Sequence, residues 1–236
     1  MSYRKSGETR SRILKAAARI FAERGYYETS IADIAAEAGI GRPSFYYYFD
    51  DKEKTARALF DSYVDRIYAA ADAAVPTRAP GDTHGVSSEA ASSDSSFDAA
   101  GRVMLNVFVK YILLFKYVAL NKATHAVYYD LVNFADYDQA NIERLKRTTF
   151  KETQGLASFY GKELSDAELV AFIVTTNAVA KSIFKAVSNG ILDFSLQEAT
   201  DYFYRHAILP DISMSETVYL ALKAEAFAIC ERTRLD

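Results

Sequence analysis

The chain has 236 residues, of which 50% are hydrophobic and 25% charged, and its formal net charge is −3. This composition excludes a wholly disordered chain and is sufficient for a small domain and a larger one, each with its own core. Because the net charge is negative, nucleic-acid binding would need a local basic surface. The single cysteine, Cys230, excludes a disulfide within the chain.

The sequence predicts a cytoplasmic protein with no membrane partner. Residues 1–16 contain no continuous apolar core and therefore do not look like a signal peptide. The longest apolar stretch, residues 103–120, is interrupted by Asn106, Lys110 and Lys116, whereas a membrane-spanning helix needs about 20 largely uncharged residues. We expect a buried helix there.

The first predicted helix runs from about Thr9 to Arg24 and stops at Gly25. The first 28 residues hold seven Lys or Arg and three Glu, a local charge of +4. A charged helix face is usually only a solvated surface. For Arg4 and Lys5, the motif that follows favours contact with DNA phosphates or a minor-groove arm.

Residues 29–53 are predicted to form two short helices joined by a glycine turn, followed at once by a third helix. The first begins at Thr29 or Ser30, whose hydroxyl can cap it, and Asp33 complements the positive end of its dipole. Gly39 lies where the chain must turn, because a residue without Cβ readily takes the left-handed conformation that ends a helix.

The second of these helices is expected to start near Arg42, with Pro43 in its first turn. Phe45 and Phe49 lie four residues apart and should face the core, so the tyrosines at positions 46–48 should line the outer side. Half-buried core packing is an equally good explanation of consecutive tyrosines on their own. The preceding turn favours DNA contact, since phenols can bind phosphates and arginine can donate to guanine O6 and N7.

Residues 9–60 resemble the DNA-binding domain of the TetR family of transcriptional regulators. The matching motifs are Thr29, Asp33-Ile34-Ala35, Ala38-Gly39, Phe45-Tyr46-Tyr47-Tyr48-Phe49 and Lys52-Glu53. Two departures are Gly41, where Ser or Thr is usual, and Thr55, where an aliphatic residue is common. From the motif and this resemblance, the expected DNA-binding residues are Thr29, Ser30, Arg42, Pro43, Ser44, Tyr46, Tyr47, Tyr48, Lys52, Arg4 and Lys5.

The expected organisation is a helix-turn-helix DNA-binding domain over residues 1–50, a flexible loop over 75–96 and a ligand-binding and dimerisation domain over 97–236. A helix from Asp51 to about Ala74, begun by a capping box of Asp50 and Glu53, connects the first domain to the rest. The loop is rich in Pro, Gly and Ser and contains almost nothing that could be buried.

Beyond Ser96 every strong pattern is helical, so the predicted fold class is all-α: an N-terminal three-helix DNA-binding domain followed by a larger helical domain. Helices are expected at about 97–120, 122–134, 138–160, 166–189, 196–208 and 215–233. Capping boxes are expected to start three of them, at Ser165 with Glu168, Ser195 with Glu198, and Ser213 with Glu216.

The helix from Asp166 to Ser188 is apolar on two sides, so each of these two sides must pack against another part of the protein or another chain. One side can pack inside the subunit, and an identical copy across a two-fold axis most simply covers the other. The resemblance likewise implies a homodimer, whose recognition helices would meet a palindromic operator about 34 Å apart. The expected interface residues are Leu169, Phe172, Ile173, Ala180, Ile183, Val187, Tyr202 and Phe203.

The resemblance also implies a small-molecule effector bound in the larger domain. A pocket that is mostly aromatic and aliphatic would suit a hydrophobic or amphipathic effector. Core packing explains each candidate residue, taken singly, more readily than ligand contact does. The candidates are Tyr63, Ile67, Asn106, Phe108, Tyr111, Phe115, His125, Tyr128, Tyr129, Phe134, Asn177 and Lys181.

These patterns together predict a ligand-responsive repressor that the effector releases from its operator; transcriptional activation is the alternative. A helical sensor or sequestering protein that never touches DNA would explain the larger domain but not the outward tyrosines. An enzyme is not expected, and neither is a metal or cofactor. The three histidines and one cysteine share no ligand spacing, and there is no phosphate-binding loop or nucleophile elbow.

Overall fold

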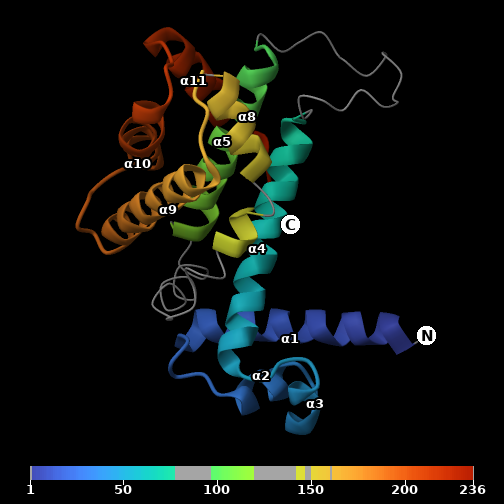
Figure 1. The fold of residues 1–236 in the computed structure, drawn as a ribbon. Coiled ribbons are helices and arrows are strands. Elements are labelled where there is room, and N and C mark those ends of the chain that lie inside the picture. Colours follow the sequence, from blue (N-terminus) through green and yellow to red (C-terminus); the bar gives the residue numbers. More distant parts are fainter. Residues whose placement is uncertain (1, 78–96, 120–141, 147–149, 160, 236) are drawn as a thin grey trace. The chain divides into compact units, whose positions relative to one another are not determined.

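The computed structural model describes residues 2–77, 97–119, 142–146, 150–159 and 161–235. Within these ranges the regular secondary structure is entirely helical, which confirms the predicted all-α fold (Figure 1). The chain divides into two compact units. The first unit comprises residues 1–66 and 116–138, and the second comprises residues 67–115 and 139–236.

The first unit contains α1 (Ser2–Arg24), α2 (Ile31–Glu37), α3 (Arg42–Tyr46) and the first turns of α4 (Lys52–Ala74). α1 packs against α2, and α2 packs against α3 (Figure 1). Their shared core is formed by side chains that are fully buried, among them Ile13, Phe21, Ile34 and Phe45. α1 begins at Ser2 rather than near Thr9, so the expected start of this helix was wrong.

The glycine turn between α2 and α3 has the predicted geometry. Ser30 is the N-cap of α2 and forms a capping box with Asp33, whose carboxylate accepts a hydrogen bond from the Ser30 backbone N–H at 2.8 Å. Gly39 has φ +64°, a conformation that costs a side-chain-bearing residue free energy. This turn sets α3 at an angle to α2 in a short stretch of chain.

The predicted cap of α4 was displaced by one residue. α4 begins at Lys52, and Asp51 accepts a hydrogen bond from the backbone N–H of Lys54 at 2.6 Å. The Asp50 carboxylate instead pairs with the side chain of Lys54. Asp50 is therefore one residue too early to cap the helix.

The second unit is built around α5 (Ala99–Leu114). α5 continues into the π-helical turn η1 (Phe115–Ala119), of which only Phe115 belongs to the second unit. α5 packs against α11 (Glu216–Arg232), α8 (Phe150–Phe159) and α10 (Leu196–Phe203). α9 (Asp166–Ser188) packs against α8, α10 and the π-helical turn η2 (Tyr204–Ile208), which leads into the 3-10 turn η3 (Leu209–Asp211) (Figure 1).

The helix predicted at 122–134 and nearly all of the 75–96 loop lie outside the described residues. Within the helix predicted at 138–160, residues 142–146 and α8 are helical. The capping boxes of Ser165 with Glu168 and of Ser195 with Glu198 are confirmed. The third was wrong: α11 is capped by Ser215, whose hydroxyl accepts a hydrogen bond from the backbone N–H of Val218.

Among the described residues, α9 is the one helix that is long and apolar enough to cross a membrane, by length and composition alone. The core helix of a soluble protein meets the same criterion. Only 33% of its most apolar window is buried inside the chain. α9 thus keeps an apolar side that the second unit does not cover.

An ionic cluster around Asp201 holds α10 and η2 to α11. The Asp201 carboxylate accepts hydrogen bonds from the Tyr219 hydroxyl at 2.6 Å, from Arg205 Nε at 2.9 Å and from the Lys223 ammonium. Partial burial raises the pKa of Asp201, but these three donors outweigh it and lower the pKa to about 2. The carboxylate therefore stays charged in the folded protein at neutral pH.

Replacing Asp201 with asparagine is expected to lower the free energy of unfolding by about 1–2 kcal/mol at neutral pH. Because folding lowers this pKa, the stabilisation is fully present above the ordinary value of 3.8 and is lost as the pH falls toward about 2. Urea unfolding measured from neutral pH down to about pH 3 should show a weaker pH dependence in the variant. Identical pH dependence in both proteins would contradict this role.

Candidate functional site

The outer side of α3 is exposed, while its inner side is buried in the first unit. Phe45 is 0% exposed and Phe49 is 6% exposed, whereas Tyr47 is 80% exposed and Tyr46 is 43% exposed. Tyr48 is half-buried. The predicted orientation of the two phenylalanines and of Tyr47 is confirmed, so this helix presents polar and aromatic groups to solvent.

Arg42, Pro43 and Ser44 are also exposed on α3. The Arg42 guanidinium donates a hydrogen bond to the Tyr46 hydroxyl at 3.3 Å and lies 5.9 Å from the centre of its ring. These contacts restrict the guanidinium to one side of the helix while most of its donors face solvent. Such an arrangement can meet the acceptors of a base edge or a phosphate.

Two expected DNA-binding residues instead stabilise the turn between α1 and α2. Thr29 is only 2% exposed, and its hydroxyl donates to the Gly25 carbonyl at 2.7 Å. The Lys52 ammonium donates to the carbonyls of Tyr26 and Thr29 at 2.7 and 2.8 Å. Both side chains therefore have structural partners within the unit, and their contact with DNA stays a prediction.

Three further residues were expected to bind DNA, and the structure describes the side chain of only one of them, Ser30. Ser30 is exposed at the start of α2, where its hydroxyl caps the helix. Arg4 and Lys5 belong to α1, so their backbone is helical rather than an extended arm; their side chains lie outside the described part. Their contact with DNA stays a prediction.

Tyr27, which no sequence motif singled out, is 68% exposed beside the buried Tyr26. It lies in the turn between α1 and α2, and its ring meets that of Tyr26 edge-on at 5.4 Å. An aromatic pair directly after Gly25 was the signal for one buried and one exposed ring. Arg12 of α1 likewise has a bracing role, because its guanidinium donates to the Ala38 carbonyl.

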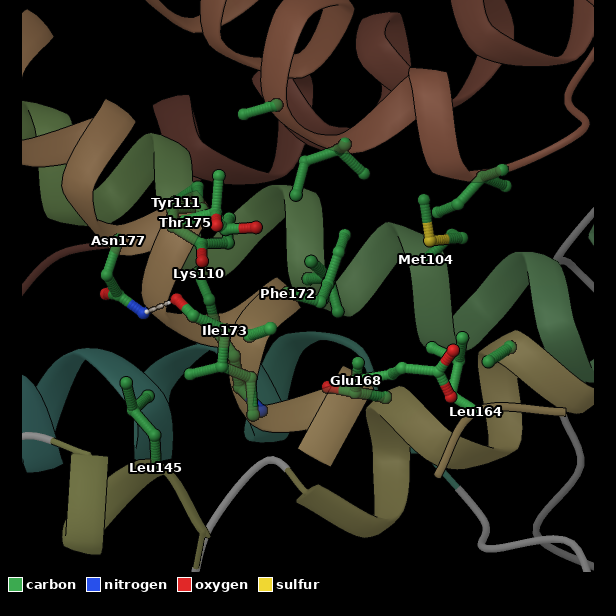
Figure 2. Close-up of a pocket in the computed structure, with 18 of the residues that line it drawn as sticks. Met104, Lys110, Tyr111, Leu145, Leu164, Glu168, Phe172, Ile173, Thr175 and Asn177 are labelled. Atoms are coloured by element: carbon green, nitrogen blue, oxygen red, sulfur yellow. Dashed lines mark hydrogen bonds between the residues drawn. The ribbon is translucent and has the colours of Figure 1, made fainter. Parts of the chain in front are cut away.

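A cavity of about 440 Å³ lies within the second unit, between α5, α8 and α9. Figure 2 shows Met104, Lys110 and Tyr111 of α5 and Phe172 and Ile173 of α9 on its walls. Ala207 and Ile208 of η2 complete part of the lining. The lining is mainly aliphatic and aromatic, which suits a small, largely apolar molecule.

Of the predicted ligand-binding residues, Tyr111 and Asn177 line this cavity. Burial raises the pKa of the Tyr111 phenol, which therefore remains a neutral donor. The Asn177 amide donates to the Ile173 carbonyl at 2.8 Å. These two residues bring polar groups to a wall that is otherwise mostly apolar.

The other described candidates lie elsewhere. Asn106 is buried and donates to Asp72 and to the Val75 carbonyl. Phe108 stacks on Tyr204 with ring centres 3.9 Å apart, and Phe115 meets Phe184 edge-on at the same separation. These three are core residues. Tyr63, Ile67 and Lys181 do not line the cavity, and His125, Tyr128, Tyr129 and Phe134 lie outside the described residues.

Two lining residues were missed as ligand candidates. Lys110 is 5% exposed, and the sequence pattern identified it only as an interruption of an apolar stretch. Thr176 is 2% exposed, and its hydroxyl has no hydrogen-bond partner. A threonine in a helix gave no signal of its own, because such a hydroxyl ordinarily bonds to the carbonyl four residues earlier.

The apolar stripe of α9 that was assigned to a dimer interface is mostly buried inside the subunit. Five of the expected interface residues are at most 6% exposed: Leu169, Ile173, Ala180, Ile183 and Phe203. Fully covered side chains cannot also meet a second chain, so this assignment is corrected. The helix has a second apolar stripe, through Val170, Val174, Ala178 and Phe184. Its first part is the more exposed one, with Val174 41% exposed, whereas Phe184 is 5% exposed. Phe172 and Val187 are half-buried and Tyr202 is 45% exposed.

No group of three or more possible metal ligands occurs in the described part of the chain.

Comparison with known proteins identifies relatives of the N-terminal part. Residues 13–59 match a family described as bacterial regulatory proteins, tetR family. The chain is 40% identical over 63 residues to the HTH-type transcriptional regulator YdgC of Bacillus subtilis, which covers 27% of this chain and 32% of that protein. It is 31% identical over 121 residues to the HTH-type transcriptional regulator TtgR of Pseudomonas putida, which covers 50% of each. The chain thus spans half or less of the length of these relatives.

The whole chain also resembles solved structures. A crystal structure of RolR in complex with its ligand resorcinol has a TM-score of 0.61 and 17% sequence identity, covering 99% of this chain and 100% of that one. At this identity the likeness shows the fold alone. It supports an N-terminal helix-turn-helix domain followed by a helical domain, in agreement with the helices of the described residues.

Proposed function

We propose that this chain, which belongs to the TetR family of bacterial regulatory proteins, regulates transcription by binding DNA through α2 and α3. The observation that carries the proposal is the division of α3 into two sides. Phe45 within α3 and Phe49, three residues after its end, anchor the helix in the first unit. Arg42 and Ser44 of α3 and its C-cap residue Tyr47 are left exposed. A helix held in this way can enter the major groove with its exposed side chains toward the bases.

Selection of bound sequences from a pool of random duplexes tests the proposal. The purified protein should enrich a palindrome, because two copies related by a two-fold axis read two equal half-sites. A sensor, a sequestering protein or an enzyme should enrich no sequence. Failure to enrich any sequence, with the protein folded by circular dichroism, would overturn the DNA-binding proposal.

The dimer is proposed to form through the exposed stripe of α9, together with Tyr202 of α10. A second copy would cover Val174 and its neighbours, which α9 leaves exposed although they are apolar. The alternative, that α9 crosses a membrane, would leave the buried side of the same helix without its packing partners in the second unit. Homodimerisation is accordingly the simpler use of this surface.

Replacing Val174 with glutamate is expected to dissociate the dimer, since two carboxylates would meet near the two-fold axis. Sedimentation should show a monomer. Operator affinity should fall by about 10²–10⁴-fold, because a monomer binds one half-site and gains nothing from a second copy already held at the other. Val174→Thr has nearly the same shape without charge and should remain dimeric. A Val174→Glu protein that is still dimeric would place the interface elsewhere.

The cavity of the second unit is proposed to bind the effector, and repression released by that effector is the proposed outcome. α4 is one continuous helix whose first turns belong to the first unit and whose last turns belong to the second. Effector binding would shift the equilibrium between two forms of the dimer by its difference in affinity for them. A cytoplasmic location, with the chromosome, is part of the same proposal. Activation of transcription is the alternative, and a reporter assay on the selected operator distinguishes the two.

A further inference from the structure

We propose that the effector is an amphipathic molecule with an anionic oxygen group, such as a carboxylate, which takes the Lys110 ammonium from Asp72. This inference rests on the proposal that the cavity of the second unit is the effector site. It adds the chemical class of the ligand and the contact through which α4 would sense it.

Lys110 carries the argument because it belongs to the cavity wall and to a contact with α4 at once. Its side chain is 6% exposed, and its ammonium lies 3.0 Å from Asp72 Oδ1 near the end of α4. The ammonium also lies 5.0 Å from the centre of the Tyr68 ring, which lines the same cavity. A ligand that binds this ammonium therefore acts on the ion pair that holds the end of α4 to α5.

The two partners of this ion pair have unequal surroundings. The Asp72 side chain is 53% exposed, whereas that of Lys110 is almost fully buried. If Lys110 turns to a ligand, Asp72 returns to water at little cost, but a buried ammonium needs a charged or strongly polar partner. Exchange of Asp72 for a ligand carboxylate keeps the buried charge paired throughout.

The same exchange would loosen the end of α4. Asp72 Oδ1 also accepts a hydrogen bond from the Asn106 amide at 2.9 Å, and that amide donates to the Val75 carbonyl at 3.0 Å. Lys110 and Asn106 thus hold the last turn of α4 to α5 through one carboxylate. When Lys110 turns to the ligand, Asp72 loses its ion pair with Lys110 and keeps its hydrogen bond with Asn106.

Thr176 supplies an independent observation in favour of an acceptor on the ligand. It lines the cavity from α9, and its buried hydroxyl has no partner in the protein. A buried hydroxyl without a hydrogen bond costs free energy that a ligand oxygen can recover. Most of the rest of the lining, including Phe172 and Met104, is apolar, so the ligand must combine its anionic group with a hydrophobic body. The other polar lining residues are Thr153, Lys162, Glu168, Thr175 and Asn177, and the anionic group must lie at Lys110, away from the Glu168 carboxylate.

Calorimetric titration of the purified protein with 4-phenylbutanoate and its carboxamide, 4-phenylbutanamide, tests the proposal, since the two differ in charge but hardly in size. The carboxylate should bind at least about tenfold more tightly. Lys110→Met should remove that difference by weakening the carboxylate alone. Asp72→Asn should strengthen carboxylate binding several-fold, because the Asp72 carboxylate no longer competes with the ligand for the Lys110 ammonium.

Lys185→Met, at an exposed position of α9, is the matched control and should leave both affinities unchanged. Equal affinity for acid and amide, binding of neither, or unchanged affinities in Asp72→Asn would overturn the proposal. So would a preference that survives in Lys110→Met but disappears in Lys162→Met, the other lysine of the lining. If Lys110→Met fails to fold, the Asp72→Asn result decides.

These titrations contain no DNA, so their outcome is separate from the selection experiment on duplexes. A protein that selects a palindrome but binds neither probe refutes the ligand class and leaves DNA binding intact. A protein that binds the acid through Lys110 but selects no sequence refutes the regulator and leaves the ligand class standing.

Discussion

Replacing Phe45 with alanine is expected to lower the free energy of unfolding by about 3–5 kcal/mol and to abolish operator binding. Phe45 is completely buried at the centre of the first unit, and its ring packs on that of Phe49 with centres 6.0 Å apart. Removing the ring leaves a cavity that α2 and α3 cannot close without losing the angle of the glycine turn. Denaturant unfolding followed by circular dichroism measures the loss.

Tyr47→Ala is the matched control for this experiment. Tyr47 lies two residues along the same short segment and is 80% exposed, so its removal should change the stability by no more than about 0.5 kcal/mol. It should nevertheless weaken DNA binding if the exposed side of α3 meets the duplex. Similar stability losses in both variants would show that α3 is packed differently.

The second large effect is expected for Arg42→Ala. Loss of a guanidinium that reads a base edge costs about 1–3 kcal/mol, and a palindrome read by two copies loses about twice that. The variant should also discriminate less between the selected operator and operators in which each guanine is replaced in turn. Fluorescence anisotropy at one fixed salt concentration measures both effects.

Arg234→Ala removes the same charge from an exposed position near the C-terminus and is the control for general electrostatics. It should scarcely change operator affinity and should leave the base preference intact. If Arg42→Ala weakens all sequences by the same factor, Arg42 contacts phosphate and not a base. Equal behaviour of the two variants would remove Arg42 from the DNA surface.

In the first unit, the features that the sequence predicted correctly are those that depend on neighbouring residues. The Ser30 cap, the left-handed Gly39 and the burial of Phe45 and Phe49 depend on residues within a few positions of each other. The structural role of Lys52 could not be predicted, because its carbonyl partners lie more than 20 residues earlier in the chain. No spacing in the sequence indicates that a lysine at a helix start will reach back to a preceding turn.

In the second unit, sequence identified the two-sided apolar character of α9 but not which side the subunit would cover. That choice depends on where α8, α10 and η2 pack, and the two stripes are similarly apolar in composition. Lys110 presents the same difficulty. Its partner Asp72 lies on another helix across the 75–96 segment, so the lysine was visible only as a break in an apolar stretch.

The π-helical turn η2 has an evolutionary consequence. Ala207 and Ile208 within it line the cavity, while Tyr202 and His206, whose rings lie 4.3 Å apart, are exposed on the adjoining surface. A π-turn fits one extra residue into a helical turn, and such turns often persist at functional sites. Because one short stretch shapes both the cavity and the outer surface beside it, mutations that alter the proposed effector site are expected to alter the proposed dimer interface as well. Divergence of the two traits among descendants of this protein should therefore be correlated.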